Sequence, residues 1–207
     1  MSLIFHYAPL SSASTTHWAL EELGVPYEKV RHAFDTGELK KPEYLKLNPN
    51  GKVPCLVVDG TPIFESIAII AYLGETYGVD KKLFPAPGMQ RAQALQWLAW
   101  ANTSLGEALS RFLHNHSERI PKEQQNAKAA EVGKADVEKH LEILDGALKG
   151  KKFLVGDSFS LVDVHLAGYA GYLGMCGFDL TKFPNVDAYN KTCSSRAAFG
   201  KIMKPDA

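Results

Sequence analysis

Residues 48–66 read NPNGKVPCLVVDGTPIFES, and this stretch decides the fold of the chain. It opens with the turn signals Asn48-Pro49-Asn50-Gly51, because glycine can take positive φ and proline fixes the angle at which the chain enters. Two short apolar runs, at 55–58 and 63–64, lie on either side of an Asp59-Gly60 turn. This pattern predicts a β-hairpin, and a helical pattern begins directly after it.

The hairpin carries groups that suit a small charged peptide. Val53 precedes Pro54, which has no N–H, so we expect Val53 to be a strand residue with main-chain groups that the sheet leaves unpaired. An extended peptide could pair with them as an added strand. Ser66 offers a hydroxyl and a backbone N–H at a helix N-terminus, which favours a carboxylate, and the Glu65 carboxylate could face an ammonium group.

Composition and charge exclude several classes of protein. The chain has 207 residues, and its 23 basic residues balance 23 acidic ones, so no charge excess indicates nucleic acid or an anionic membrane. Its three cysteines are an odd number without metal-ligand spacing, which favours a reducing compartment over a disulfide framework. The apolar run at 3–5 is too short for a signal sequence, and no stretch approaches membrane-spanning length. We therefore expect a cytoplasmic protein without nucleic-acid, membrane or metal partners.

The first 78 residues read as an α/β domain. Strands and helices alternate in the apolar pattern, with Gly24 as the stop signal of the first helix. The expected order is a strand at 3–7, a helix at about 12–23, a strand at 27–30, a short helix within 34–47, the hairpin, and a helix from Ser66.

A linker follows, and the rest of the chain reads as helical. Pro85 and Pro87 predict a linker at 79–88 and an all-helical domain at 89–207. The first helix of this domain is expected at 89–116. Its apolar stripe comprises Leu95, Leu98, Leu105, Leu109 and Phe112, and Asn102 is the one polar member.

The later helices have their own start signals. Pro121 suits the first position of a helix that we expect to end at Gly150. Residues 159–164, FSLVDV, combine a hydrophobic staple with an S-x-x-D capping box, which predicts a central buried helix. Two short helices, near 184–192 and 195–203, are expected to finish the chain.

These features together resemble the cytosolic glutathione transferases, and the resemblance covers essentially the whole chain. The motifs that carry it are NPNGKVP at 48–54, Glu65-Ser66, the proline-containing linker, and the S-x-x-D box in the helical half. The resemblance implies an α/β thioredoxin-like N-terminal domain and an all-α C-terminal domain. It also implies a cis Val53–Pro54 peptide bond and a homodimer with each active site near the subunit interface.

The resemblance assigns residues to glutathione. Val53, beside Pro54, would pair through its backbone with the cysteinyl unit, and Glu65 and Ser66 would hold the γ-glutamyl end. Without the resemblance, Glu65 and Ser66 would read as a helix cap and nothing more. Two lysines align with positions that contact the glycyl carboxylate or nearby backbone in related classes, and are otherwise solvated surface charges: Lys40 and Lys52.

The catalytic position is open between two serines. An ungapped match to the bacterial cysteine-type class places its cysteine on Ser12, whereas a match to the serine-type plant class places its serine on Ser11. A match to the tyrosine-type enzymes puts His6 on their tyrosine, with Tyr7 next to it. We prefer Ser12, with Ser11 as the alternative, and either gives a serine-type site at the N-terminus of the first helix. Read without the resemblance, Ser12 would be the helix N-cap.

Two further positions separate the chain from the cysteine-type class. Gly106 stands where the aligned helix of that class has a histidine that reaches the site, and its small size would widen the pocket. Cys55 lies inside a strand, and we expect it to be a small core residue rather than a nucleophile. Disulfide exchange and covalent glutathione adducts need a protein thiol at the catalytic position, so a serine excludes them.

A hydroxyl beside the thiol of glutathione is chemically useful because the thiolate is the nucleophile. A hydrogen bond to the sulfur and the helix N-terminus together lower a thiol pKa by roughly 1–3 units. We therefore expect a glutathione transferase that conjugates small hydrophobic electrophiles in detoxification. Glutathione is then a substrate, and no cofactor is implied. The alternatives are a peroxidase, dehalogenase or isomerase that uses the same thiolate, and a non-catalytic glutathione-binding scaffold module.

Overall fold

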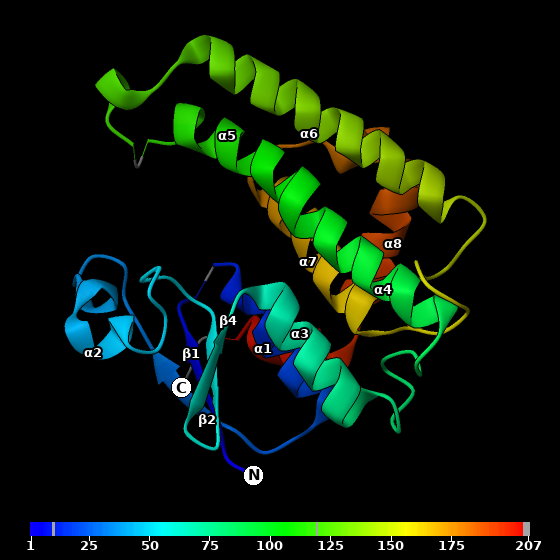
Figure 1. Ribbon diagram of the computed structural model, residues 1–207. Coiled ribbons are helices and arrows are strands. Elements are labelled where there is room, and N and C mark those ends of the chain that lie inside the picture. Colours follow the sequence, from blue (N-terminus) through cyan, green and yellow to red (C-terminus); the bar gives the residue numbers. More distant parts are fainter. Residues whose placement is uncertain (10, 119, 205–207) are drawn as a thin grey trace.

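The chain folds into a four-stranded sheet flanked by helices, followed by an all-helical part (Figure 1). The computed structural model describes residues 1–9, 11–118 and 120–204. The elements of the first part are β1 (Leu3–Tyr7), α1 (Ala13–Leu23), β2 (Glu28–Arg31), the 3₁₀ turn η1 (Glu38–Lys40), α2 (Pro42–Leu45), β3 (Cys55–Val58), β4 (Thr61–Phe64), α3 (Ser66–Leu73) and the π-helical turn η2 (Gly74–Gly78). This arrangement confirms the expected thioredoxin-like domain.

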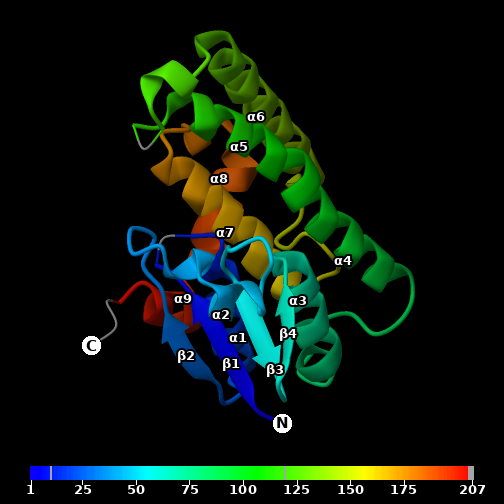
Figure 2. The same ribbon diagram turned by 60° about the vertical axis from the view of Figure 1, so that its left-hand side comes forward.

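The sheet has the strand order β2-β1-β3-β4, with β1 parallel to β2 and antiparallel to β3. Side chains alternate along the central strand β1, so its two faces contact different helices. The Phe5 ring lies 5.7 Å from the ring of His17 on α1, whereas the His6 ring lies 5.7 Å from that of Tyr44 on α2. Helices α1 and α3 thus cover one face of the sheet and α2 lies on the other (Figure 1, Figure 2).

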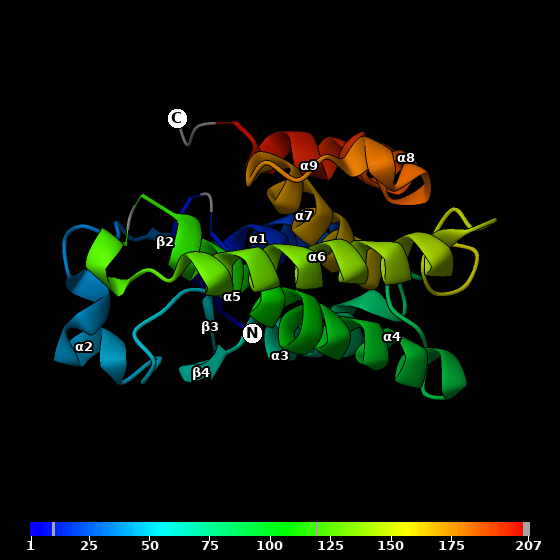
Figure 3. The same cartoon turned by 90° about the horizontal axis from the view of Figure 1, so that it is seen from above.

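The second part is built around helix α7. Its elements are α4 (Met89–Trp100), the π-helical turn η3 (Ala101–Leu105), α5 (Gly106–His116), the 3₁₀ turn η4 (Lys122–Gln124), α6 (Ala127–Leu148), α7 (Leu161–Met175), the 3₁₀ turn η5 (Leu180–Lys182), α8 (Pro184–Ser194) and α9 (Ala197–Ile202). Helices α4 and α5 form one rod beside α6, and α7 lies between this rod and α8 (Figure 3). Residues 205–207 of the expected domain lie outside the described residues.

The apolar stripe of the α4–α5 rod differs from the prediction at its N-terminal end. Leu98, Leu105 and Leu109 are buried as expected, but Leu95 is 40% exposed and Ala94 is buried instead. The wider π-helical turn η3 accounts for the difference, because it changes the register between the two helices. A single regular period over the whole rod therefore cannot describe its buried face.

The prediction that Pro121 begins the long helix is wrong. Pro121 precedes only the short turn η4, and α6 begins at Ala127. Asn126 caps α6, since its side-chain oxygen accepts a hydrogen bond from the backbone N–H of Ala129 at 3.1 Å. A side-chain cap satisfies one of the free N–H groups of the first turn, which a proline at the first position does not.

The capping box at the start of α7 is confirmed. Asp163 is fully buried, and its carboxylate accepts from the backbone N–H of Ser160 at 2.8 Å and from the Ser160 hydroxyl at 3.0 Å. It also accepts from the backbone N–H of Leu154 at 2.9 Å and from the Tyr189 hydroxyl at 3.0 Å. Burial raises the pKa of Asp163, although these hydrogen bonds act to lower it. One carboxylate thus joins the preceding loop, α7 and α8.

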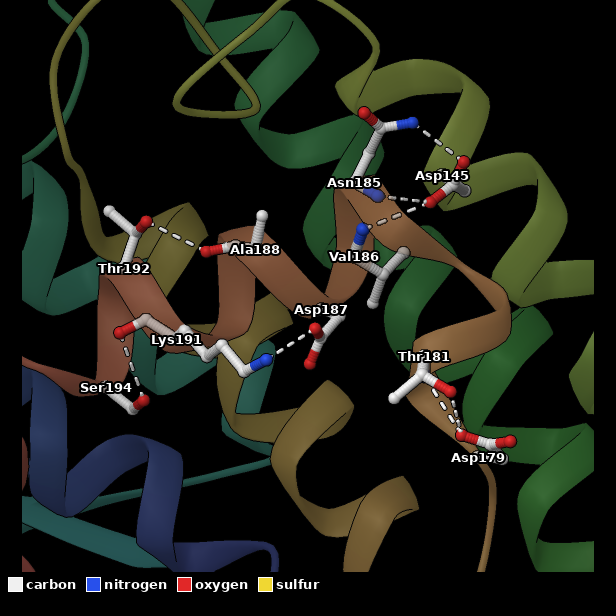
Figure 4. A network of polar contacts seen from close by, with 10 residues as sticks. All are labelled: Asp145, Asp179, Thr181, Asn185, Val186, Asp187, Ala188, Lys191, Thr192 and Ser194. Atoms are coloured by element: carbon white, nitrogen blue, oxygen red, sulfur yellow. Dashed lines mark hydrogen bonds and ion pairs between the residues drawn. The ribbon is translucent and has the colours of Figure 1, made fainter.

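A second carboxylate fixes α8 on α6 (Figure 4). Asp145 accepts from the backbone N–H groups of Asn185 and Val186 at 2.8 and 3.1 Å, and from the Asn185 side-chain amide at 2.8 Å. These N–H groups belong to the first turn of α8, where a negative charge is favourable. Around them, Lys191 pairs with Asp187 at 2.6 Å on the exposed side of the helix.

Several contacts join the two parts. Phe84 is buried, and the backbone N–H of Leu161 donates to the Leu83 carbonyl at 2.8 Å. Arg196 makes two hydrogen bonds to the Glu22 carboxylate, at 2.8 and 2.7 Å, and lies over the Phe159 ring. The exact division at 79–88 stays a prediction. Within the described ranges, every helix is too short or too polar to span a bilayer.

We expect Asp163→Ala to lower the free energy of unfolding by about 2–5 kcal/mol. The substitution leaves the N–H groups of Leu154 and Ser160 buried without their acceptor, and each such group costs about 1–3 kcal/mol. Urea unfolding at a fixed protein concentration measures the loss. The control is Asp157→Ala, an exposed aspartate in the same loop, with an expected change within about 0.5 kcal/mol. Equal losses in the two variants would contradict the role assigned to Asp163.

Candidate functional site

The loop before β3 is fixed by side chains of the first domain. The Asn48 amide and the Tyr44 hydroxyl both donate to the Lys52 carbonyl, each at 2.7 Å. The Asn48 side-chain oxygen also accepts from the backbone N–H of Asn50 at 3.0 Å. The Val53–Pro54 peptide bond that follows is cis, as the resemblance implied. The loop therefore presents Val53 in one defined position.

Val53 lies just outside the sheet. The expectation that it is a strand residue is wrong, because β3 begins only at Cys55. Among the described residues, no main-chain group pairs with Val53. Its carbonyl instead accepts a hydrogen bond from the Ser12 hydroxyl at 3.2 Å. The structure thus brings the preferred serine to the backbone group that the resemblance assigns to the cysteinyl unit.

The two candidate serines have different partners. The Ser11 hydroxyl donates to the Ala8 carbonyl at 2.7 Å and accepts from the backbone N–H of Ala13 at 3.1 Å. Ser11 is therefore engaged on both sides in the turn that begins α1. Ser12 stands at the N-cap position of α1, as the reading without the resemblance predicted, but its hydroxyl makes no cap hydrogen bond. Ser12 is exposed, and the geometry favours it over Ser11 as the residue that faces a ligand.

His6 and Tyr7 lie on opposite faces of the sheet. Tyr7 is buried, and its ring stacks on Phe5 at 5.4 Å. His6 Nδ1 lies 3.0 Å from His32 Nε2. Burial and the neighbouring His32 lower the pKa of His6 to about 4, so its ring is neutral at pH 7. Neither residue takes the place of the Ser12 hydroxyl beside Val53.

Glu65 and Ser66 lie at the start of α3. Glu65 is exposed and has a positive φ of 69°, a backbone angle that is uncommon for residues other than glycine, asparagine or aspartate. Ser66 is the first residue of α3 and is 4% exposed. Its hydroxyl oxygen accepts from the Asn102 amide at 3.1 Å. Asn102 is a residue to which sequence reasoning gave no function, and the one signal was its polar nature in an apolar stripe.

The two candidate lysines come from different segments of the first domain. The Lys40 ammonium donates to the Asn50 carbonyl at 3.0 Å, although Lys40 comes from the distant turn η1. Lys52 is exposed and directly precedes Val53. Lys40 thus reaches the loop that precedes Val53, and Lys52 is part of that loop.

Gly106 is partly buried and lies against Tyr169, whereas Cys55 is fully buried. A Cβ placed on Gly106 would lie 3.2 Å from the Tyr169 hydroxyl, so Tyr169 occupies the space and the expected wider pocket is not seen there. Cys55 is fully buried, and burial raises the pKa of its thiol to about 11. Its sulfur lies 3.7 Å from the Leu47 carbonyl. Cys55 is thus a core residue, as predicted, and its thiol is not ionised at pH 7.

A cavity of about 350 Å³ lies elsewhere in the helical part. It is lined by Gln93, Trp97 and residues of the segment 150–157. None of the candidate site residues lines it. The candidate site is therefore defined by backbone groups and side chains around Val53 and Ser66 rather than by this cavity.

A thioredoxin-like domain with a cis-proline loop, joined to an all-helical domain, defines the class of the glutathione transferase fold. Two family models match the chain: glutathione S-transferase, N-terminal domain, at residues 3–75, and glutathione S-transferase, C-terminal domain, at residues 101–197. The chain therefore belongs to the glutathione S-transferase family, and its class of enzyme is glutathione transferase.

Individual relatives agree with this assignment. Glutathione S-transferase GstB of Escherichia coli strain K12 is 31% identical over 186 residues, which cover 89% of this chain and 88% of the relative. A sphingomonad glutathione S-transferase, solved in complex with glutathione, is 26% identical with a TM-score of 0.85, over 97% of this chain and 96% of the other. A glutathione transferase homolog from Lodderomyces elongisporus, with two glutathione molecules per subunit, has a TM-score of 0.89 over 98% and 97% of the chains. At 23% identity it supports the fold alone.

We expect Gly51→Ala to destabilise the protein by about 1–3 kcal/mol more than Gly60→Ala. Both glycines have positive φ, 58° and 84°, so both substitutions carry the cost of a left-handed backbone. A Cβ on Gly51 would lie only 2.6 Å from the Leu39 carbonyl oxygen, whereas Gly60 has no described atom within 4 Å. Urea unfolding of the two variants measures the difference. Similar losses would contradict the close packing of this loop.

Proposed function

We propose that the protein binds glutathione, stabilises its thiolate with the Ser12 hydroxyl, and conjugates it to small hydrophobic electrophiles. The observation that carries the proposal is the 3.2 Å contact between the Ser12 hydroxyl and the Val53 carbonyl. A cysteinyl unit paired with Val53 has its side chain next to this backbone group. Its sulfur is then within reach of the same hydroxyl.

Glutathione is proposed to lie extended across the open backbone of Val53, beside Pro54. Its γ-glutamyl carboxylate binds the hydroxyl and N–H of Ser66, where the N-terminus of α3 favours an anion. Its ammonium faces the exposed Glu65. At the other end, the glycyl carboxylate is attracted by Lys40 of the turn η1 and by Lys52 of the loop.

Binding is proposed to redirect the Ser12 hydroxyl. The cysteinyl N–H takes over the Val53 carbonyl as its acceptor, which releases the Ser12 hydroxyl to donate to the sulfur. A thiol with a pKa of about 8.5 is roughly 3% ionised at pH 7. Hydrogen bonds to charged groups are worth about 1.5–3 kcal/mol, and the N-terminus of α1 adds about 0.3–1 kcal/mol. The thiolate then becomes a large fraction at neutral pH.

The reaction itself needs only the thiolate and a bound electrophile. The thiol proton passes to water, and the sulfur lone pair forms a bond to the electrophilic carbon. With an aromatic halide, the carbon–halogen bond breaks and the halide leaves with its electron pair. Ser12 donates a hydrogen bond throughout and takes no proton. The buried Cys55, with its raised pKa, has no part in this chemistry.

The proposal also covers the place where the electrophile binds, the oligomeric state and the alternative reactions. The electrophile is expected to bind between the hairpin and helix α4. The apolar side chains there are scattered along the sequence, and they do not identify the electrophile. By resemblance to the family, we propose a homodimer that works in detoxification in the cytoplasm. Glutathione-dependent peroxide reduction, dehalogenation or isomerisation uses the same thiolate and is the alternative enzyme reaction.

We expect Ser12→Ala to raise the pKa of bound glutathione by about 1–2 units, with binding affinity nearly unchanged. The thiolate fraction at pH 7 then falls, and the pH at which activity rises moves upward by the same amount. Ultraviolet absorbance of the thiolate, titrated on the glutathione complex, measures the shift. Ser11→Ala is the matched control. It should lower stability through loss of the Ala8 and Ala13 contacts and leave the thiol pKa in place. An unchanged titration in Ser12→Ala would remove Ser12 from the mechanism.

We expect the protein to be retained on immobilised glutathione and to turn over a generic aromatic halide. Retention depends on the peptide site, whereas turnover also needs an ionised thiol and a bound electrophile. The two measurements together separate an enzyme from a binding module. Retention without turnover of any of a panel of halides, peroxides and isomerisable substrates would favour the scaffold module.

A further inference from the structure

A polar cluster joins the helical domain to the start of α3. The Asn102 amide nitrogen donates to the Ser66 oxygen at 3.1 Å. The Asn102 side-chain oxygen accepts from the Tyr169 hydroxyl at 3.2 Å and lies 2.8 Å from His165 Nε2. His165 and Tyr169 are one turn apart on α7, with ring centroids 5.1 Å from each other. The proposed function uses Ser66 but assigns nothing to the residues behind it.

The backbone at Asn102 is itself unusual. Asn102 lies on the π-helical turn η3, which separates α4 from α5. Such turns are rare, and they frequently occur at functional sites. Ala101 and Leu105, at the two ends of the turn, are fully buried, whereas the Asn102 amide meets three polar partners. The turn η3 thus places the Asn102 amide among polar groups, although the neighbouring buried positions of the α4–α5 rod are apolar.

The protonation of the partners determines which of them donate. His165 is fully buried, and burial lowers its pKa to about 3, so the ring is neutral with a single N–H. Burial and the nearby charge of Glu65 raise the pKa of Tyr169 to about 12, so its hydroxyl keeps its proton. Both groups can therefore donate to the Asn102 oxygen, which leaves the Asn102 NH₂ group facing Ser66.

The cluster extends to the first turn of α1. The Thr15 hydroxyl lies 3.3 Å from His165 Nδ1 and 3.2 Å from the Ser12 carbonyl. The single Thr15 proton goes to the Ser12 carbonyl, and with the proton of the neutral His165 ring on Nε2 the ring donates to the Asn102 oxygen. Helices α1 and α7 pack closely at this point, since a Cβ on Gly168 would lie 2.5 Å from Thr15 Cγ2. Each ring nitrogen of His165 thus lies next to a polar atom.

The orientation of the Asn102 amide decides what Ser66 can offer a ligand. With the NH₂ group toward Ser66, the serine oxygen accepts and its own proton is available to a ligand. With the amide turned over, the Asn102 oxygen would take the Ser66 proton. Ser66 would then present only lone pairs, which repel a carboxylate. Donation from Tyr169 and His165 to the Asn102 oxygen favours the first orientation.

We propose that Asn102, held by His165 and Tyr169, is a positioning residue that keeps the Ser66 hydroxyl a donor to the γ-glutamyl carboxylate of glutathione. Ligands that carry this carboxylate are thereby selected over those that lack it. The inference rests on the proposed function, in which Ser66 touches the ligand. Asn102 acts through Ser66 and needs no contact of its own with glutathione.

The test compares two ligands on Asn102→Asp. This substitution replaces the NH₂ group by an oxygen, so Ser66 must donate to it, and the new charge repels the ligand carboxylate. Calorimetric titration measures the affinity for glutathione and for γ-aminobutyryl-cysteinyl-glycine, which lacks only the γ-glutamyl carboxylate. We expect the glutathione affinity to fall at least about tenfold and the analogue affinity to change less than about threefold.

Two further variants complete the design. Asn115→Asp is the matched control, since Asn115 lies on the same rod and bonds to the Arg111 carbonyl and the Asn126 N–H, away from the site. It should leave both affinities unchanged. Tyr169→Phe removes one donor to the Asn102 oxygen with little change of shape. It should weaken glutathione binding by about two- to fivefold and spare the analogue, and it carries the test if Asn102→Asp fails to fold.

The outcomes separate this inference from the proposed function. Selective loss of glutathione affinity in Asn102→Asp or Tyr169→Phe supports the positioning role. Equal losses for both ligands mean that the cluster serves folding only and overturn it, as do unchanged affinities in both variants. If the unmodified protein binds neither ligand, the proposed function fails as well.

Discussion

The arrangement of the two domains depends on the hydrogen bonds that the buried carboxylate of Asp163 accepts. It accepts hydrogen bonds from the loop before α7, from the α7 cap and from α8. A carboxylate without these partners would cost several kcal/mol in the interior, so the loop and α8 must close on it when α7 is placed. Helix α7 contacts α1, α4 and α8. Its position therefore sets how the helical domain meets the sheet.

The candidate site is built in two different ways at its two ends. The loop that presents Val53 is held within the first domain, by Tyr44 and Asn48. Ser66, in contrast, is contacted by Asn102 from the second domain, and Asn102 is held by side chains of α7. The contacts that hold the Val53 loop are thus local, whereas the contact to Ser66, proposed for the γ-glutamyl end of glutathione, forms only when the two domains are docked.

Local signals in the sequence predicted much of this protein, because the residues that produce them are neighbours in the chain. The hairpin, the stop at Gly24 and the α7 capping box depend on contacts within a few residues. The start of α6 was missed because Pro121 and Asn126 both carry start signals, and the structure uses Pro121 before the short turn η4 and Asn126 as the cap of α6. The partners of Asn102 could not be predicted, since Ser66 and His165 are 36 and 63 residues away. A polar residue in an apolar stripe marked Asn102 as unusual, but the sequence did not indicate which residues it contacts.

In the proposed mechanism, the contacts that position glutathione matter as much as the hydrogen bond from Ser12 to its sulfur. Ionising a thiol that is about 3% thiolate at pH 7 increases the nucleophile by at most roughly thirtyfold. Typical enzyme accelerations exceed this by several orders of magnitude, so most of the effect must come from holding sulfur and electrophile together. A misplacement of about 1 Å can cost roughly a hundredfold, more than the Ser12 hydroxyl contributes to ionisation. In the proposed mechanism, the contacts that fix both ends of the tripeptide, far from the sulfur, therefore have a direct influence on the rate.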